Sequence, residues 1–109
     1  MWIQTDIGDR ALNKGHYEPF GNNAMLCADP LTGEIRRVLT GPFGQEITGV
    51  TTTPDGRTMF VNVQHPGAHT SADEFAQGRL GSHWPAGGSA VPRSATLVIT
   101  RENGGIVGA

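Results

Sequence analysis

The clearest pattern of hydrophobic and polar positions lies between Gly44 and Pro66, in the stretch GQEITGVTTTPDGRTMFVNVQHP. Two runs rich in β-forming residues, 47–53 and 58–64, are joined through Thr-Pro-Asp-Gly-Arg. Pro54 fixes φ for a turn and Gly56 supplies the backbone freedom that closes it. The stretch is therefore predicted to form a β-hairpin.

The second run of this hairpin alternates between two faces. Its apolar face carries Met59, Val61 and Val63, and positions 60, 62 and 64 point the other way. Glu46 stands just before the hairpin and His65 just after it. A carboxylate and an imidazole thus mark the ends of two adjacent strands, and we expect any chemistry there.

Shorter apolar runs predict four further strands, at 1–6, 24–28, 34–40 and 95–101. Residues 7–23 are polar and glycine-punctuated, which predicts a loop with one helical turn around 10–13. Ile35 and Val38 break the alternation of their strand, so a bulge or an edge position is expected there. No helix could serve as a parallel crossover, so the sheet is predicted to be antiparallel.

Residues 67–94 are predicted to form a long loop within the domain, because they contain five glycines, two prolines and no strand-like run. Ser71 and Glu74 have the spacing of a capping box, which predicts a short helix through Ala76. A compact domain seldom carries so long a structureless connection unless the loop is functional, disordered or packed on a neighbour.

The predicted fold class is all-β, with antiparallel strands forming about one and a half blades of a β-propeller over residues 1–109. The basis is the succession of short strands and tight turns, which resembles the outer and inner strands of consecutive blades. Blades stack face to face around an axis, so this piece would leave an apolar face open at each end. The partners expected to cover those faces are missing propeller blades or further copies of the chain.

Composition and charge restrict the kinds of partner that the chain could bind. The net charge is -2, charged residues make up 17% of the chain, and the largest basic cluster is Arg36-Arg37, so nucleic acid is excluded as a partner. No apolar run approaches the ~20 residues of a membrane span, and no export signal is present. Either the protein is cytosolic or the targeting segment belongs to an absent part of the chain. The single cysteine, Cys27, cannot form an internal disulfide, and its apolar surroundings predict a small buried residue.

Several motifs in a fixed order resemble the C-terminal part of the PhoX-type alkaline phosphatases, a family of secreted bacterial phosphatases. They are Glu-Ile-Thr-Gly at 46–49, Gln-His-Pro-Gly at 64–67, His-Trp-Pro at 83–85 and Pro-Arg-Ser-Ala-Thr at 92–96. The likeness covers most of the chain from Gly21 onward. Thr-Pro-Asp-Gly-Arg-Thr is less specific, because many propellers use such a turn.

The resemblance implies a six-bladed propeller whose axial site holds iron and calcium and hydrolyses phosphate monoesters, with this chain as about its last fifth. It also implies a periplasmic or extracellular location, with the export signal and the iron-bridging cysteine in an earlier part. Cys27 does not match that cysteine's position. On this interpretation the isolated chain is inactive, and no residue of it is assigned a catalytic role.

Glu46 is the candidate metal ligand, because carboxylate oxygens suit hard cations such as Ca²⁺. The alternative is a solvated glutamate after a turn. The amides of Asn22 and Asn23 could offer oxygens to a metal or, more simply, cap a turn.

His65 and Arg93 are the candidate substrate-binding residues, since imidazole can donate a proton and guanidinium binds phosphate through two parallel hydrogen bonds. No His-x-His or His-x₃-His spacing links His65 to His83, and loop packing is the simpler role for both histidines. Arg57 lies in the hairpin turn, where solvation is the simpler role.

Two other functions stay open. The chain could be a stand-alone structural or binding module that self-associates through its open sheet edges. It could also be a segment of a lactonase-like or quinoprotein-like propeller, although that class does not predict the His-Trp-Pro loop.

Overall fold

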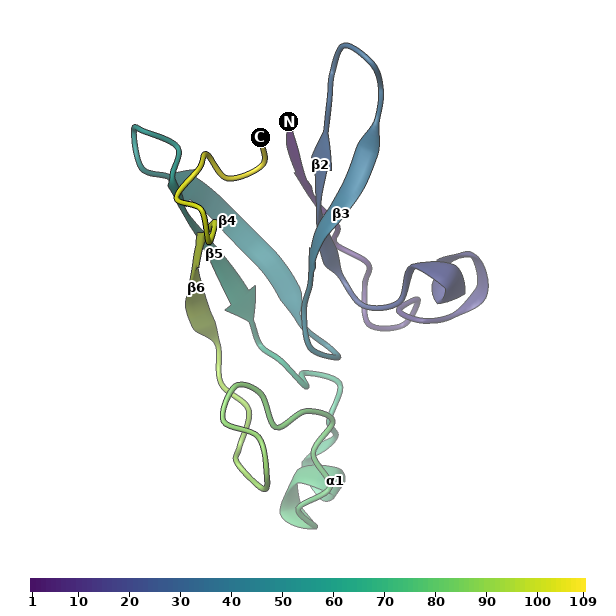
Figure 1. Cartoon of the computed structure of the whole chain (residues 1–109). Helices are drawn as coiled ribbons and strands as arrows, with labels where there is room; N and C mark the ends of the chain where they lie inside the picture. Colours follow the sequence, from purple (N-terminus) through teal and green to yellow (C-terminus); the bar gives the residue numbers. More distant parts are fainter.

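The computed structural model describes residues 1–109, which form six strands in two antiparallel three-stranded sheets (Figure 1). The first sheet contains β1 (Trp2–Gln4), β2 (Ala24–Ala28) and β3 (Ile35–Thr40), in that order. The second contains β4 (Glu46–Thr52), β5 (Thr58–Gln64) and β6 (Ala95–Thr100). The all-β antiparallel prediction is confirmed, and each predicted strand is present within a few residues of its expected bounds.

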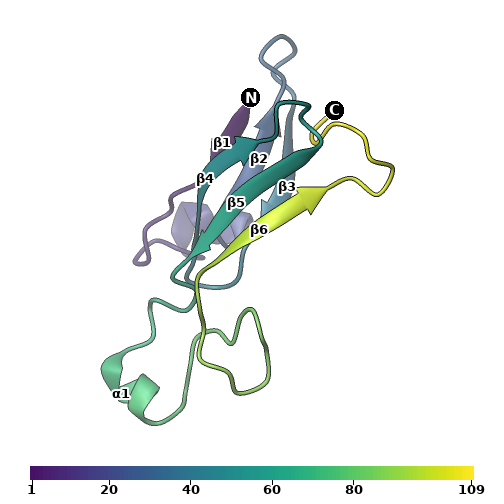
Figure 2. The same cartoon turned by 90° about the vertical axis from the view of Figure 1, so that its left-hand side faces the viewer.

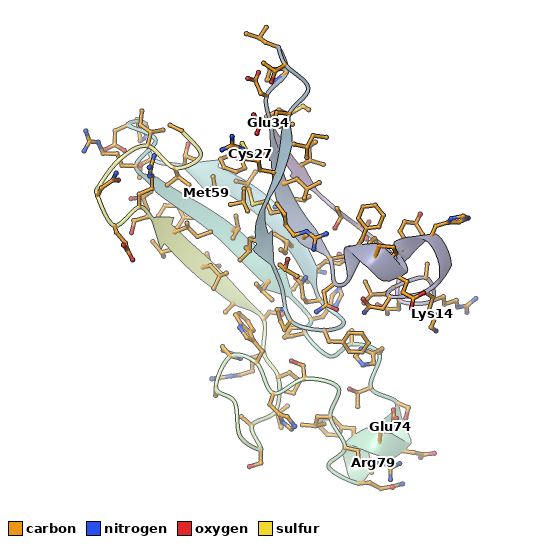
Figure 3. All side chains as sticks on the ribbon, turned by 45° about the vertical axis from the view of Figure 1, so that its right-hand side comes forward. Lys14, Cys27, Glu34, Met59, Glu74 and Arg79 are labelled. Carbon is orange, nitrogen blue, oxygen red and sulfur yellow. The ribbon has the colours of Figure 1, made fainter.

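The two sheets pack against each other through a small core (Figure 2). Met25 of β2 meets Ile47 of β4 and Met59 and Val61 of β5, and all four side chains are at most 2% exposed. In Figure 3, Met59 lies on the second sheet near its upper end. The predicted alternation of β5 is confirmed, because Met59, Val61 and Val63 are buried while the intervening positions are not.

The irregularity expected in the third strand is also confirmed. The register between β2 and β3 shifts between Met25 and Leu26, which leaves Val38 as the extra residue opposite them, and β3 is an edge strand. A second bulge, which the sequence did not predict, lies in β4 between Thr48 and Thr51. It includes Gly49 at φ 52°, a conformation that glycine adopts without strain.

The first loop differs from its prediction. The Leu12 amide donates to the Gly8 carbonyl at 3.1 Å and so closes one helical turn near the predicted place, but a 3₁₀ helix that was not predicted, η1 (Gly15–Phe20), follows it. Leu12 is 5% exposed, whereas its neighbours in the loop are half-buried or exposed.

The long loop contains the short helix α1 (Ala72–Ala76), as predicted. Ser71 and Glu74 form the complete capping box, with the Ser71 side chain accepting from the Glu74 amide and the Glu74 carboxylate accepting from the Ser71 amide. Glu74 and Arg79 lie at the end of the molecule farthest from the β2–β3 turn (Figure 3). Neither helix is long or apolar enough to cross a membrane.

The molecule is elongated, and much of its surface is open. Its radius of gyration is 15.6 Å, whereas about 13 Å is expected for a compact domain of this length. Only 13 of 109 residues are buried. The two termini lie at the same end (Figure 1), where Gly108 sits against the Trp2 ring and the Val107 amide donates to the Gly56 carbonyl. The outer faces of both sheets have no covering layer.

Candidate functional site

Glu46 and His65 lie side by side where β4 begins and β5 ends. Glu46 pairs with Gln64 across the ladder, so the residue after Gln64 reaches the Glu46 side chain. The His65 Nε2 atom is 3.5 Å from Glu46 Oε1, and the two side chains are 36% and 35% exposed. This distance confirms the expectation that polar groups meet at these two strand ends.

Several contacts fix His65. Its backbone has φ 38°, which is unusual for a residue other than glycine. The backbone amide donates to Ser94 Oγ at 2.9 Å, and the ring Nδ1 is 3.3 Å from the carbonyl oxygen of Gly44. The segment after His65 is held to the turn that precedes β4, because the Gly67 amide donates to the Phe43 carbonyl at 2.9 Å.

A shallow polar hollow of about 490 Å³ adjoins this pair on the outer face of the second sheet. Hydroxyl and amide side chains dominate its wall: Thr48, Asn62, Gln64, Ser94 and Thr96. Thr96 Oγ1 donates to Asn62 Oδ1 at 2.7 Å, so two of the strands are also linked across the hollow. Such a surface offers hydrogen bonds to a polar ligand but encloses little of it.

Arg93 lies one residue before Ser94 and is exposed. Its backbone amide donates to the Trp84 carbonyl at 3.0 Å, and its guanidinium forms no hydrogen bond or ion pair. The structure therefore brings Arg93 close to the site along the chain but gives it no contact with Glu46 or His65.

The residues of this chain do not by themselves form a complete metal site. No group of three or more His, Cys, Asp or Glu side chains gathers anywhere in it. Calcium takes six to eight oxygen ligands, and only the Glu46 carboxylate is offered here. Glu46 and His65 together fit one edge of a site for a transition metal such as iron, which accepts both carboxylate and imidazole.

The asparagine pair has a structural role. Asn23, 1% exposed, accepts hydrogen bonds at Oδ1 from Thr5 Oγ1 and from the Ile7 amide, at 3.0 and 2.7 Å. Asn22 Oδ1 accepts from Asn13 Nδ2 at 3.2 Å. Both amide oxygens are thus engaged within the fold, which favours the turn-capping alternative over metal binding.

Three other candidates also serve the fold. His83 Nδ1 donates to the Ala90 carbonyl at 2.9 Å inside the long loop. Arg57 Nη1 donates to the Gly104 carbonyl at 2.9 Å, so it links two turns instead of being solvated alone. Cys27 is only half-buried, so the expectation of a buried cysteine is not met: it lines a shallow hollow on the central strand β2 together with Arg36 and Ala109.

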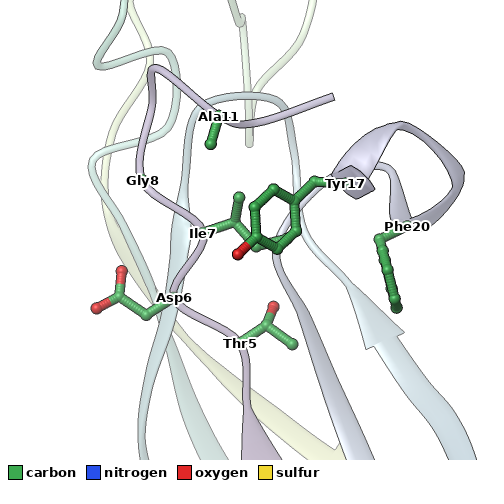
Figure 4. Close-up of a pocket in the computed structure, with 7 residues that line it drawn as sticks. All are labelled: Thr5, Asp6, Ile7, Gly8, Ala11, Tyr17 and Phe20. Atoms are coloured by element: carbon green, nitrogen blue, oxygen red, sulfur yellow. The ribbon is translucent and has the colours of Figure 1, made fainter. Parts of the chain in front are cut away.

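An apolar groove of about 320 Å³ lies away from Glu46 and His65, between the loop after β1 and helix η1 (Figure 4). The rings of Tyr17 and Phe20 border it opposite Thr5, Asp6 and Ile7. Tyr17 and Phe20 are 44% and 52% exposed. No titratable cluster opens into this groove, so it is part of the uncovered apolar surface.

Two residues of the site were missed in the sequence. Gly44 supplies the carbonyl that contacts the His65 ring, and Ser94 supplies the hydroxyl that holds its amide. Ser94 lies 29 positions from His65, so only the pairing of β5 with β6 brings the two together. The Pro-Arg-Ser-Ala-Thr motif was the available signal, but it did not reveal which residue Ser94 supports.

Comparison with known proteins identifies the family. A family model described as alkaline phosphatase PhoX matches residues 1–67. Among solved structures, the chain is similar to Pseudomonas fluorescens PhoX in complex with vanadate, a transition state analogue, with 47% sequence identity and a TM-score of 0.81. No curated protein matches the chain.

The structural match covers 99% of this chain but only 17% of the Pseudomonas fluorescens protein. The chain therefore spans about a sixth of the length of that relative. Within this chain, the match covers almost every residue. With the family model matching more than half of its residues, this chain belongs to the PhoX alkaline phosphatase family.

Proposed function

We propose that this chain is the C-terminal part of a metal-dependent phosphate monoester hydrolase, to which it contributes parts of two β-propeller blades. Alone it is inactive. The single observation that carries the proposal is the 47% identity, over 99% of this chain, to a PhoX structure solved with vanadate. Vanadate mimics the transition state of phosphoryl transfer, so phosphate ester chemistry is the activity that the likeness supports.

The two sheets support the propeller part of the proposal. Each is a three-stranded antiparallel sheet in which one pair of strands, β2–β3 or β4–β5, is joined by a short turn, and the two sheets pack face to face. Exposed apolar side chains lie on both sheets, with Ile35 of β3 59% exposed and Val98 of β6 64% exposed. Further blades, from an earlier part of a longer secreted polypeptide, would cover these faces.

Within the site, we assign Glu46 to a cation and Arg93 to the phosphate group. The Arg93 guanidinium is unpaired and so is free to form a bidentate contact with phosphate oxygens. The polar hollow beside Ser94 supplies hydroxyl and amide donors to the rest of the substrate. His65 was expected to bind substrate, but its distance to Glu46 supports a role at the cation instead.

Calcium and iron are the cofactors that the family likeness implies. Metal ions in such a hydrolase neutralise phosphoryl oxygens and activate a water molecule as the nucleophile. This chain contributes at most one edge of such a centre, so the remaining ligands belong to other blades. That requirement is why the isolated chain is expected to be inactive.

The proposal is tested with the purified 109-residue chain, p-nitrophenyl phosphate, Ca²⁺ and iron. We expect no hydrolysis above that of the metals in buffer, and a solution mass above that of a monomer because apolar faces are open. Hydrolysis that disappears in a Glu46→Gln variant would contradict inactivity of the isolated chain. A well-folded monomer in solution would contradict the expectation that the open apolar faces make the chain self-associate.

A second candidate function is a structural module that self-associates. It is favoured by β6, a free edge strand of six uncharged residues, Ala-Thr-Leu-Val-Ile-Thr, with no proline and no bulge. Such an edge lacks the features that prevent pairing with another strand. The two functions are compatible. A Val98→Lys variant that becomes monomeric would show that self-association runs through β6, and an unchanged solution mass would contradict this.

A further inference from the structure

We propose that the free edge of β6 binds the β6 edge of a second copy of this chain, antiparallel and with Val98 opposite Val98. The inference rests on the self-association proposed above and adds to it the partner strand, the symmetry and the register. The two copies would share one continuous sheet, in the order β4-β5-β6 followed by β6-β5-β4, with a twofold axis between the two Val98 residues.

The edge strands of the molecule differ in how well they are protected against pairing. β1 has only three residues, β3 contains Arg36 and Arg37, and the edge strand β4 is bulged around Gly49. Short length, charge and bulges are the features by which natural sheets prevent edge pairing. β6 has none of them, because its six residues are uncharged and pair with β5 in an unbroken register (Figure 2).

Symmetry restricts how two β6 edges can meet. Two identical edges pair antiparallel around a twofold axis perpendicular to the sheet. Residues that lie opposite each other in such a sheet point to the same face, so their numbers differ by zero or by an even number. The two registers that satisfy this condition and pair five of the six β6 residues are centred on Leu97 and on Val98.

Side-chain type selects the register centred on Val98. Thr96 then lies opposite Thr100 on the outer face, where Val98 is 64% exposed. On the inner face Leu97 lies opposite Ile99, and both of these side chains already pack against the core. Pairs of hydroxyl with hydroxyl and of apolar with apolar side chains stabilise antiparallel strands. The register centred on Leu97 instead sets Thr96 opposite Val98 and loses the hydroxyl pair.

Charges just beyond the two ends of β6 fit the same register. Arg93 and Glu102 are both exposed, and neither side chain forms an ion pair within the chain. In the register centred on Val98, Ser94 falls opposite Glu102 of the second copy, so Arg93 lies beside that carboxylate. The twofold axis repeats this contact of opposite charges at the other end. A second copy therefore matches the β6 edge in charge as well as in side-chain type.

The test traps the pairing with disulfides in the 109-residue chain, in a Cys27→Ser background. Val98→Cys brings two thiols together on the twofold axis. Thr100→Cys is the matched control, because it is exposed on the same face but would lie more than about 12 Å from its own copy, whereas a disulfide needs Cα atoms within about 7 Å. Under mild oxidation we expect Val98→Cys to form a cross-linked dimer at least about tenfold faster than Thr100→Cys.

A mixture of two variants tests the register itself. Thr96→Cys chains mixed with Thr100→Cys chains should form a cross-linked dimer with one chain of each kind, although either variant alone should cross-link slowly. Equal rates for Val98→Cys and Thr100→Cys would overturn the inference. So would a mixture of Thr96→Cys and Val98→Cys that cross-links as fast as the first mixture, because that result places Leu97 on the axis.

Hydrogen exchange of the unsubstituted chain gives a measurement that needs no variant. Alternate amides of β6 face the open edge, and they should exchange more slowly when the protein concentration is raised about a hundredfold. Unchanged exchange along β6 would contradict the pairing. If the chain self-associates but all cross-linking rates are equal, this inference fails and self-association stands. Hydrolysis is not measured, so failure of the proposed phosphatase role would be seen separately, as an inactive chimera.

Discussion

Gln45 links the two sheets at the scale of single residues. Its side chain is 1% exposed, and its Nε2 donates to the carbonyl of Asn23 at 2.9 Å. Asn23 Nδ2 donates in return to the Gln45 carbonyl at 3.2 Å. These bonds join the residue before β2 to the residue before β4, so they set the distance between the sheets next to Glu46.

Gly41→Ala is expected to break this link. A methyl group at position 41 would lie 2.1 Å from Gln45 Cδ, and the buried amide cannot move aside without losing its bond to Asn23. We expect a loss of about 1–3 kcal/mol in the free energy of unfolding, measured by urea denaturation.

The matched control is Gly8→Ala, because a methyl group there meets nothing within 4 Å and the φ of Gly8 is not positive. Its effect should stay within about 0.5 kcal/mol. Equal losses for the two variants would show that Gln45 does not set the sheet spacing.

Residues of the site could be predicted from the sequence where a local pattern, such as a strand end, determines their position. The strand ends predicted Glu46 beside His65, and the structure brings them to 3.5 Å. Gly44 and Ser94 were not predictable, since their roles depend on which strands pair and on the turn after β5. The buried positions of Asn23 and Gln45 were hidden for the same reason, because polar residue types mostly lie on the surface.

At the scale of elements, the β4–β5 turn is closed by Asp55. Its carboxylate accepts from Thr53 Oγ1 at 2.6 Å and from the Arg57 amide at 3.1 Å. These hydrogen bonds, the Thr53 hydroxyl first, lower the pKa of Asp55 below its ordinary value of 3.8. Gly56 completes the turn at φ 67°, as the Thr-Pro-Asp-Gly pattern predicted.

The lowered pKa makes the turn sensitive to acid. A carboxyl group with a depressed pKa in the folded state stabilises the fold above its unfolded pKa, and this contribution is lost as the pH falls through the folded value. The contribution of Asp55 should therefore be complete above pH 3.8 and decline below it.

Asp55→Asn removes this carboxylate, so unfolding free energies between about pH 6 and pH 2 should fall less steeply in the variant than in the unchanged chain. Asp9→Asn is the control, because Asp9 is exposed and its carboxylate forms no hydrogen bond. If the unfolding free energies of Asp55→Asn and of the unchanged chain fell equally steeply with pH, the stabilising role of the Asp55 carboxylate in this turn would be refuted.

Elements bounded by strong turn signals were predicted closely. β2 and β5 have the predicted ends, and α1 begins after the predicted Ser71 cap. Helix η1 was missed because it has only six residues, about two turns at three residues per turn, and none of them is buried, so no apolar pattern marks it. The bulge at Gly49 was missed because a single glycine within a strand pattern does not show how the partner strand is aligned.

At the scale of the molecule, most of the surface is open to solvent. The radius of gyration of 15.6 Å and the uncovered outer faces show that the two sheets bury only a small shared core. The sequence could predict the number of strands and their antiparallel pairing. It could not predict what covers the outer faces, because none of the elements that these 109 residues form packs on them.

Under the proposed function, this chain contributes to hydrolysis only when the rest of a phosphatase surrounds it. The direct measurement replaces the matching segment of Pseudomonas fluorescens PhoX, 17% of that chain, with this sequence and follows hydrolysis of p-nitrophenyl phosphate. We predict an active chimera, activity at least about tenfold lower with Glu46→Gln, and unchanged activity with Glu102→Gln. A folded chimera that hydrolyses nothing, or one in which Glu46→Gln is as active as the unchanged sequence, would contradict the account.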